Sequence, residues 1–159
     1  MKTELELATG IIKQLRKSGK TVAVAESLTG GGLGAALTEV AGSSEVFLGG
    51  FTTYSDVSKS KLLEIPKRLI TKHTAVSEEV ARAMAENVRQ IFKSDFAIST
   101  TGVAGPGKAY GKKAGTVWLA IASKKETIAI ELALAGDRAT VRKATIESAL
   151  AAFSRILIP

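Results

Sequence analysis

The sequence predicts a three-layer α/β domain, in which helices cover both faces of a mixed, mostly parallel sheet of about five strands. Short β-branched runs alternate with segments in which apolar residues recur at helical spacing. Two glycine clusters directly follow predicted strands, and no repeat, low-complexity segment or linker divides the chain. A length of 159 residues is typical of one domain, so we expect residues 1–159 to form a single unit.

The first half of the chain alternates helices and strands. Apolar residues at helical spacing between Leu5 and Leu15 predict a helix that ends at Gly19. Gly49 and Gly50 lie inside a strand pattern and indicate a bulge or a close approach of backbones. The elements predicted after the first helix are a buried strand over 21–25, a helix reaching about Val40, a strand over 46–54, a short helix from Asp56 and a helix with Pro66 in its first turn.

The second half contains a long helix, three strands and a final helix. Ser77 is a good N-cap, and the acidic residues that follow it favour the start of a helix. Strands are predicted over 96–99, 116–122 and 127–134, and the adjacency of the last two predicts one antiparallel strand. Asp137 caps the final helix. The residues expected on the buried faces of the two helices are Val80, Ala83, Met84, Val88, Ile91, Val141, Thr145, Ser148, Ala152 and Ile156.

The composition excludes several kinds of chemistry. The sequence has no cysteine and one histidine, His73, which excludes disulfides, thiolate nucleophiles, sulfur-ligated zinc and clusters of histidine around a metal. We therefore expect neither a metal nor a cofactor. The N-terminus lacks the apolar stretch of a signal peptide, and nowhere do ~18 apolar residues run without a charge. These patterns predict a soluble, cytoplasmic protein with no membrane partner.

The net charge of +7 raises the question of an anionic partner. The basic residues concentrate between Val57 and His73 and between Lys108 and Lys125. Neither stretch interleaves aromatic residues with the basic ones, as a surface for single-stranded nucleic acid would, so we do not expect nucleic acid as the partner. The charge fits a solvated lysine-rich face or a site for a small anionic ligand.

The glycine clusters indicate where a functional site would lie. Of 15 glycines, four lie between Gly30 and Gly34 and five between Gly102 and Gly115. Both clusters follow predicted strands, at the edge where open α/β sheets place their ligands.

Two phosphate-binding motifs are matched only in part. The segment 102–109 falls one residue short of a P-loop, because Ala109 stands where a Ser or Thr hydroxyl would hold magnesium. We therefore interpret Lys108 as a loop lysine. Gly30-x-Gly32-x-x-Ala35 matches a short dinucleotide fingerprint, but the following strand pattern ends without the expected acid.

Ser27 lies at the turn between the first strand and the next helix. A hydroxyl there can project beside free backbone N–H groups that would stabilise an oxyanion. The alternative is that Ser27 or Thr29 simply caps the helix. A serine nucleophile also needs a base, and His73 lies among lysines, which leaves a lysine as the choice.

Lys59 is the candidate base. Tyr54 ends the second strand, and Lys59 falls in the first turn of the helix that begins near Asp56. The positive end of the helix dipole, neighbouring cations and partial burial would each disfavour an ammonium there. The alternative is a solvated lysine near a helix start.

These residues belong to a set of motifs that resembles the CinA C-terminal domain family, which includes stand-alone nicotinamide mononucleotide (NMN) deamidases. The motifs follow the family's order from about Thr21 to Ile156, nearly the whole chain. The matching segments are Ala25–Gly31, Gly50–Lys59, Ala75–Ser77, Gly102–Pro106, Gly115–Trp118 and Gly136–Arg138.

The resemblance implies an amidohydrolase of pyridine nucleotide salvage that converts NMN to nicotinic acid mononucleotide and ammonia. Ser27 would be the nucleophile, Lys59 the general base, and Tyr54 the residue that orients or polarises the pair. The N–H groups around Thr29, Gly30 and Gly31 would bind the oxyanion. The further residues expected at the substrate are Thr101, Gly102, Ala104 and Gly105.

The phosphate of the substrate is assigned to the start of the final helix. Asp137 is a good N-cap, so the free N–H groups and the positive dipole end lie at this point. Arg138 adds a planar donor fork suited to phosphate oxygens, and Arg142, one turn further along, would share the contact. The alternative is an ordinary capped helix with two solvated arginines.

The chain departs from the family's pattern at two points. Leu28 replaces the cysteine commonly found after the serine, and the loop 107–114 lacks the usual glycine-rich form with Lys-Pro-Val. Larger CinA proteins carry an N-terminal domain that resembles molybdopterin-binding proteins, and we do not expect this domain in the present chain. We expect a homo-oligomer that acts on a small molecule. The alternatives are a nucleotide-binding regulatory module without turnover and a competence- or DNA-damage-associated protein.

Overall fold

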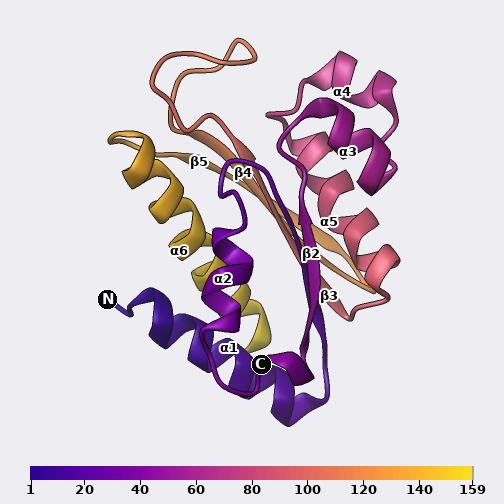
Figure 1. The fold of residues 1–159 in the computed structure, drawn as a ribbon, viewed down its shortest axis with the longest axis vertical. Coiled ribbons are helices and arrows are strands. Elements are labelled where there is room, and N and C mark those ends of the chain that lie inside the picture. The colour runs from indigo at the N-terminus through magenta and orange to yellow at the C-terminus, as the bar shows by residue number, and fades with distance from the viewer. Residues whose placement is uncertain (159) are drawn as a thin grey trace.

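The computed structural model describes residues 1–158, which form one three-layer α/β domain (Figure 1). The strands of its single sheet are β1 (Val22–Glu26), β2 (Phe47–Thr52), β3 (Phe96–Gly102), β4 (Thr116–Ser123) and β5 (Thr127–Ala133). The helices are α1 (Glu4–Ser18), α2 (Gly32–Thr38), the short 3-10 helix η1 (Ser43–Glu45), α3 (Asp56–Leu63), α4 (Lys67–His73), α5 (Glu78–Phe92) and α6 (Arg138–Leu157).

The sheet has the order β2-β1-β3-β4-β5. Strand β1 pairs in parallel with both β2 and β3, whereas β4 is antiparallel to β3 and to β5. One strand therefore runs against the other four, as predicted from the adjacency of the last two strands. The carboxyl ends of β1, β2 and β3 lie at the same edge, where their connections can build a site.

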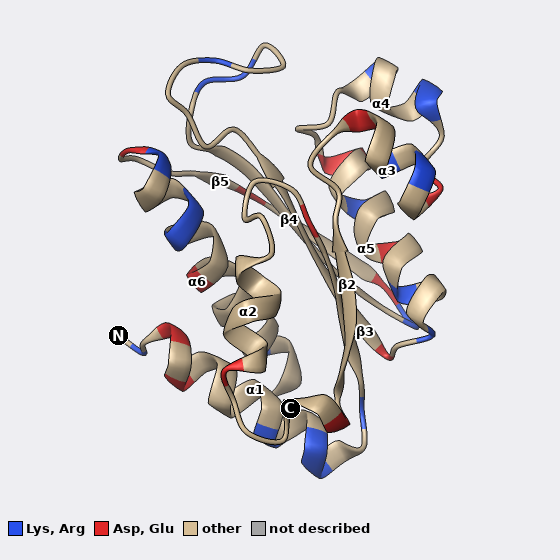
Figure 2. Cartoon of the chain, in the orientation of Figure 1, with Lys and Arg blue, Asp and Glu red and all other residues tan. Residues whose placement is uncertain are grey.

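Helices cover both faces of the sheet. Helices α1, α2 and α6 lie on one face and α3, α4 and α5 on the other (Figure 1). Two large apolar clusters and a smaller one of alanines fill the spaces between these layers. One large cluster includes Ile11, Leu33 and Phe153, and the other includes Leu63 and Met84. The lysines and arginines are distributed over helices and loops on both sides of the sheet (Figure 2). Within residues 1–158, no helix combines the length and the apolar character needed to cross a membrane.

Gly49 and Gly50 behave as the strand pattern predicted. The register between β1 and β2 shifts at Leu48, because Phe47 lies opposite Val22 and Gly49 lies opposite the next residue of β1. A Cβ atom on Gly50 would collide with the backbone oxygen of Val24. A glycine is therefore required here for the two strands to approach.

The predicted buried faces of α5 and α6 were partly wrong. In α5, Ile91 is exposed, and the small residues Ala81 and Ala85 instead contact alanines of β4. The apolar pattern favoured large side chains, whereas close contact with the sheet selects small ones. In α6, Ile156 is exposed and Ser148 and Ala152 are half-buried. The residues of α6 that are buried are Val141, Thr145, Ala149, Leu150 and Phe153.

Candidate active site

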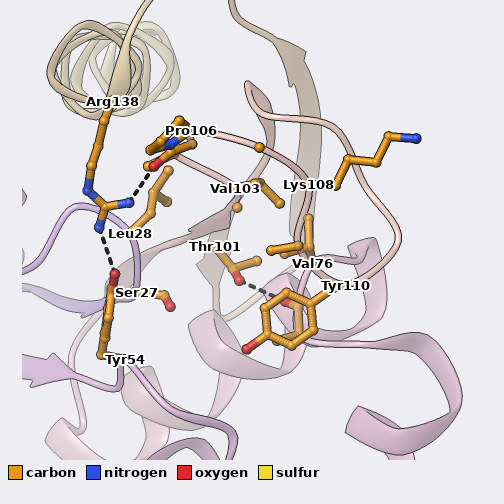
Figure 3. Close-up of a pocket in the computed structure, with 16 residues that line it drawn as sticks. Ser27, Leu28, Tyr54, Val76, Thr101, Val103, Pro106, Lys108, Tyr110 and Arg138 are labelled. Atoms are coloured by element: carbon orange, nitrogen blue, oxygen red, sulfur yellow. Dashed lines mark hydrogen bonds between the residues drawn. The ribbon is translucent and has the colours of Figure 1, made fainter.

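A cleft of about 250 Å³ lies at the carboxyl edge of the parallel strands (Figure 3). Ser27 and Leu28, which follow β1, line one side, and Tyr54, which follows β2, lines another. The end of β3 and the loop after it supply residues 101–110, and Arg138 reaches the cleft from the start of α6. Ala75 and Val76, between α4 and α5, complete the lining, so five separate segments meet at one point of the fold.

The predicted nucleophile and base are in direct contact. The Nζ atom of Lys59 lies 3.0 Å from Oγ of Ser27 and donates to the carbonyl oxygen of Thr53 at 2.7 Å. The side chain of Lys59 is buried, with only 1% of its surface exposed. Burial lowers the pKa of Lys59 from 10.5 to about 8, although the nearby carboxylate of Asp56 opposes the shift. A measurable fraction of the amine is therefore neutral at ordinary pH.

Helix α3 carries Lys59 into the protein. Ser55 caps this helix by accepting from the N–H of Ser58, and the hydroxyl of Ser58 accepts from the N–H of Ser55 in return. This capping box fixes the start of the helix, so Lys59, its fourth residue, points toward the end of β1. Of the three causes predicted from the sequence, the helix dipole, neighbouring cations and partial burial, burial is the dominant cause of the lowered pKa.

The turn after Ser27 is closed by its own backbone. The N–H of Gly30 donates to the carbonyl of Ser27 at 3.0 Å, and the side chain of Thr29 is fully buried. The predicted oxyanion residues Thr29, Gly30 and Gly31 are therefore not among those that line the cleft, whereas Leu28 is. The N–H groups of Leu28, Thr29 and Gly31 form no hydrogen bond with any residue in the described part of the chain.

Glu26 is a site residue that the sequence argument missed. Its carboxylate, 2% exposed, accepts from the hydroxyl of Thr29 at 2.6 Å and from the N–H groups of Leu33 and Gly34 at 2.8 and 3.0 Å. The carboxylate thus caps α2, whose own N-cap residue, Gly31, has no side chain to do so. An acidic residue at the end of a wholly buried strand was the available signal.

Arg138 connects two walls of the cleft. Its Nη1 donates to the carbonyl of Gly105 at 2.7 Å and its Nη2 to the hydroxyl of Tyr54 at 2.8 Å (Figure 3). Asp137 caps α6 by accepting from the N–H of Thr140, a bond that lowers the pKa of this carboxyl group. Among residues 1–158 the three other N–H groups of this guanidinium have no acceptor, so they can bind a ligand.

Arg142 does not line the cleft. Its Nε and Nη2 donate to the carbonyls of Leu28 and Thr29 at 3.0 and 3.3 Å. The structure therefore gives no support to the predicted contact between Arg142 and a phosphate.

The end of β3 and the loop after it hold the remaining predicted residues at the cleft. Thr101, Gly102, Ala104 and Gly105 all line it, and the hydroxyl of Thr101 donates to the carbonyl of Ala75 at 2.7 Å. The loop leads into β4 and not into a helix, so the partial P-loop match has no structural counterpart. Lys108 points away from the other labelled residues, consistent with a loop lysine (Figure 3).

Thr53 and Tyr110 are two further residues that the sequence argument did not identify. The carbonyl of Thr53 fixes the amine of Lys59, a backbone role that no side-chain pattern can indicate. Tyr110 lines the cleft, and its hydroxyl donates to Asp56 at 3.3 Å. Burial, followed by the charge of Asp56, raises the pKa of Tyr110. Its position in the altered loop was the only available signal.

Comparison with known proteins identifies the family. The family model described as the CinA C-terminal domain matches residues 4–157. A CinA-like protein from Geobacter sp. (strain M21) is 49% identical over 137 residues, which cover 86% of this chain and 33% of that protein. A CinA-like protein from Parasynechococcus marenigrum (strain WH8102) is 43% identical over 159 residues, which cover 98% of this chain and 38% of that protein. The chain spans about a third of the length of the curated relatives it matches.

Solved structures agree with this result. The crystal structure of the competence damage-inducible protein A (ComA) from Klebsiella pneumoniae subsp. pneumoniae MGH 78578 has a TM-score of 0.96 to this chain. The two sequences are 34% identical, and the match covers 98% of each chain. The fold, the order of the motifs and the family model lead to the same conclusion. The chain belongs to the CinA C-terminal domain family.

Proposed function

We propose that this protein is an amidohydrolase that converts NMN to nicotinic acid mononucleotide and ammonia through a Ser-Lys mechanism. The observation that carries the proposal is the 3.0 Å contact between Nζ of Lys59, which is buried, and Oγ of Ser27, which lines the cleft. A serine becomes a nucleophile when an adjacent base takes its proton, and a lysine whose pKa lies near 8 is such a base. The choice of NMN rests on the family resemblance.

The bond from Lys59 to Thr53 suits this role. A neutral amine has two N–H groups and one lone pair, and donation to the carbonyl of Thr53 leaves the lone pair free to face the hydroxyl of Ser27. The proton of the Ser27 hydroxyl then passes to Nζ as Oγ attacks the carboxamide carbon. Lys59 returns that proton to the nitrogen as the C–N bond breaks and ammonia leaves.

The acyl-enzyme is cleared by the same pair. Lys59, neutral again, takes a proton from a water molecule as the water attacks the ester carbon, and the proton returns to Oγ of Ser27. The product carries a carboxylate in place of the carboxamide. The oxyanion of both steps would be held by the N–H of Leu28, a residue that lines the cleft and whose N–H has no acceptor in the described chain.

Arg138 and the two tyrosines suit the rest of a pyridine nucleotide. The free donors of Arg138 at the mouth of the cleft fit a phosphate, and the rings of Tyr54 and Tyr110 line the same space. The bond from Arg138 to Tyr54 would link the binding of the phosphate to the position of Tyr54, which lines the same cleft as Ser27.

The test is release of ammonia from NMN by the purified protein and by Ser27→Ala. The wild type is expected to turn over, and the variant is expected to lose at least about 10³-fold in kcat with its NMN affinity retained, because the hydroxyl acts on the chemical step. Turnover that survives in Ser27→Ala would overturn the covalent mechanism. Binding of NMN without ammonia release by the wild type would favour the regulatory module. Neither NMN binding nor turnover, together with DNA binding that weakens steeply with salt, would favour the nucleic-acid-associated alternative.

A further inference from the structure

Arg142 holds the turn that carries the nucleophile, although it lies in α6, more than a hundred residues away in sequence. Its guanidinium donates to two successive carbonyls, those of Leu28 and Thr29. A Cβ atom on Gly30 would lie 3.3 Å from its Nη2, so the guanidinium sits directly against the turn. The planar donor fork of arginine suits such a pair of acceptors, whereas the single ammonium of a lysine does so less well.

These two bonds fix the directions of two N–H groups. In a trans peptide the N–H points opposite to the carbonyl of the same unit. Holding the carbonyl of Leu28 therefore directs the N–H of Thr29 away from Arg142, and this N–H has no acceptor in the described chain. Holding the carbonyl of Thr29 likewise directs the N–H of Gly30, which donates to the carbonyl of Ser27 and closes the turn.

A second charged group holds the same turn at another point. The buried carboxylate of Glu26 accepts from the hydroxyl of Thr29 and from the first N–H groups of α2. The turn is thus fixed by a carboxylate at its side-chain hydroxyl and by a guanidinium at its carbonyls. A cation bonded to a peptide carbonyl also polarises that peptide, which makes its N–H a stronger donor.

We propose that Arg142 is a positioning residue for the reaction: by holding the carbonyls of Leu28 and Thr29 it fixes the turn that carries Ser27, and so keeps Oγ of Ser27 against the amine of Lys59. This inference rests on the proposed role of Ser27 as nucleophile. Arg142 would not contact the substrate, and its effect would fall on the chemical step. The effect of Arg142 would be the same for substrates with and without a phosphate, in contrast to the effect expected for Arg138.

The experiment compares Arg142→Ala, Arg142→Lys and the control Lys143→Ala on NMN and on nicotinamide riboside, which lacks the phosphate. Lys143 is the exposed neighbour in α6 and lies 3.9 Å from Glu147, so its removal takes the same charge from the same helix without touching the turn. We expect Arg142→Ala to lose roughly 10- to 100-fold in kcat on both substrates, with little change in KM. Arg142→Lys should recover part of the loss, and Lys143→Ala should match the wild type.

A second readout separates this proposal from the choice of substrate. A fluorophosphonate probe labels a nucleophilic serine, because Oγ bonds to phosphorus, fluoride leaves and the proton passes to Lys59. The labelling rate at Ser27, located by mass spectrometry, should fall in Arg142→Ala by a factor similar to the fall in kcat. Labelled wild type that releases no ammonia from NMN would overturn the proposed substrate while the variants still test Arg142.

Two results would overturn the role of Arg142. The first is labelling at the wild-type rate in both Arg142 variants when their melting temperatures match the wild type. The second is a loss at least tenfold larger on NMN than on the riboside, which would make Arg142 a phosphate ligand. If Arg142→Ala melts below the assay temperature, the test rests on Arg142→Lys, which keeps the aliphatic stem and a donor group. Ser27 of Arg142→Lys should then be labelled more slowly than Ser27 of the wild type.

Discussion

The amine of Lys59 lies 3.0 Å from the hydroxyl of Ser27, although 32 positions separate the two residues in sequence. The contact arises because β1 and β2 are parallel neighbours, so the residues that follow them emerge at the same edge of the sheet. Ser27 directly follows β1, and Lys59 lies in α3, the helix that follows β2. Burial of an amine at this point has consequences for both activity and stability.

The activity should depend on the protonation of Lys59. The neutral amine is the active form, so kcat/KM on NMN is expected to rise about tenfold per pH unit below the pKa of about 8 and to level off above it. The profile should be measured between pH 6.5 and 9.5, because this range lies above the second pKa of the NMN phosphate, which is near 6. Lys59→Arg should be nearly inactive throughout, because a guanidinium keeps its proton.

Lys61→Arg, on the exposed side of the same helix, is the control and should keep the wild-type profile. An active Lys59→Arg variant, or a profile that is flat across this range, would show that Lys59 is not the base.

The buried amine should also make stability depend on pH. Because the pKa of Lys59 falls from 10.5 to about 8 on folding, the unfolded chain binds more protons between these values, and the stability of the wild type rises with pH there. Lys59→Met removes this titrating amine, so the variant does not share the gain in stability. The free energy of unfolding of Lys59→Met minus that of the wild type should therefore fall by roughly 2–3 kcal/mol between pH 7 and pH 10.

Urea unfolding of both proteins at the two pH values measures this difference. Lys61→Met, which removes a solvated ammonium, should show a difference from the wild type that does not change with pH. A difference for Lys59→Met that stays constant or grows with pH would contradict the lowered pKa.

Glu26 should be required for the stability of the turn and of α2. In Glu26→Gln, an amide NH₂ replaces one of the two carboxylate oxygens. This NH₂ then faces either the N–H of Gly34 or the hydroxyl of Thr29 and the N–H of Leu33, so that donors face donors. Leaving such buried groups unpaired costs roughly 1–3 kcal/mol, which thermal or urea unfolding would detect. The exposed residue Glu39 at the end of α2 supplies the control, since Glu39→Gln should change stability by less than about 0.5 kcal/mol. Equal effects of the two substitutions would mean that the carboxylate of Glu26 is dispensable.

The fold could be predicted from the sequence because its signals are local. Ser77 and Asp137 cap helices where their side chains predict it, and Gly50 lies where the backbones of two strands approach. The errors concern which side of a helix is buried. Ile91 is exposed while small alanines of the same helix contact the sheet, and that choice depends on the distance between layers, which no local pattern contains.

The residues of the candidate site were predictable to a smaller extent. The sequence singled out Ser27 and Lys59 by type and by position after strands, and the structure brings them together. It could not indicate that Arg142 reaches back to the carbonyls of Leu28 and Thr29, because backbone acceptors leave no mark in a side-chain pattern. The carbonyl of Thr53 was missed for the same reason. Contacts of this kind depend on the packing of α6 and β2 against the turn.

Arg138 provides the last prediction, because the structure gives it two functions. Its guanidinium already donates to Tyr54 and to Gly105, so Arg138→Ala should lower kcat/KM on every substrate through the altered cleft. If the remaining donors bind the phosphate, NMN should lose a further factor of roughly 10 to 100 relative to nicotinamide riboside, since a charge-assisted hydrogen bond contributes ~1.5–3 kcal/mol. The ratio of kcat/KM values for the two substrates measures this factor without interference from the common loss. Arg142→Ala is the matched comparison and should leave the ratio unchanged, because its guanidinium is bonded to the Ser27 turn. An unchanged ratio in Arg138→Ala would instead assign the phosphate to the segment 102–108, which also lines the cleft.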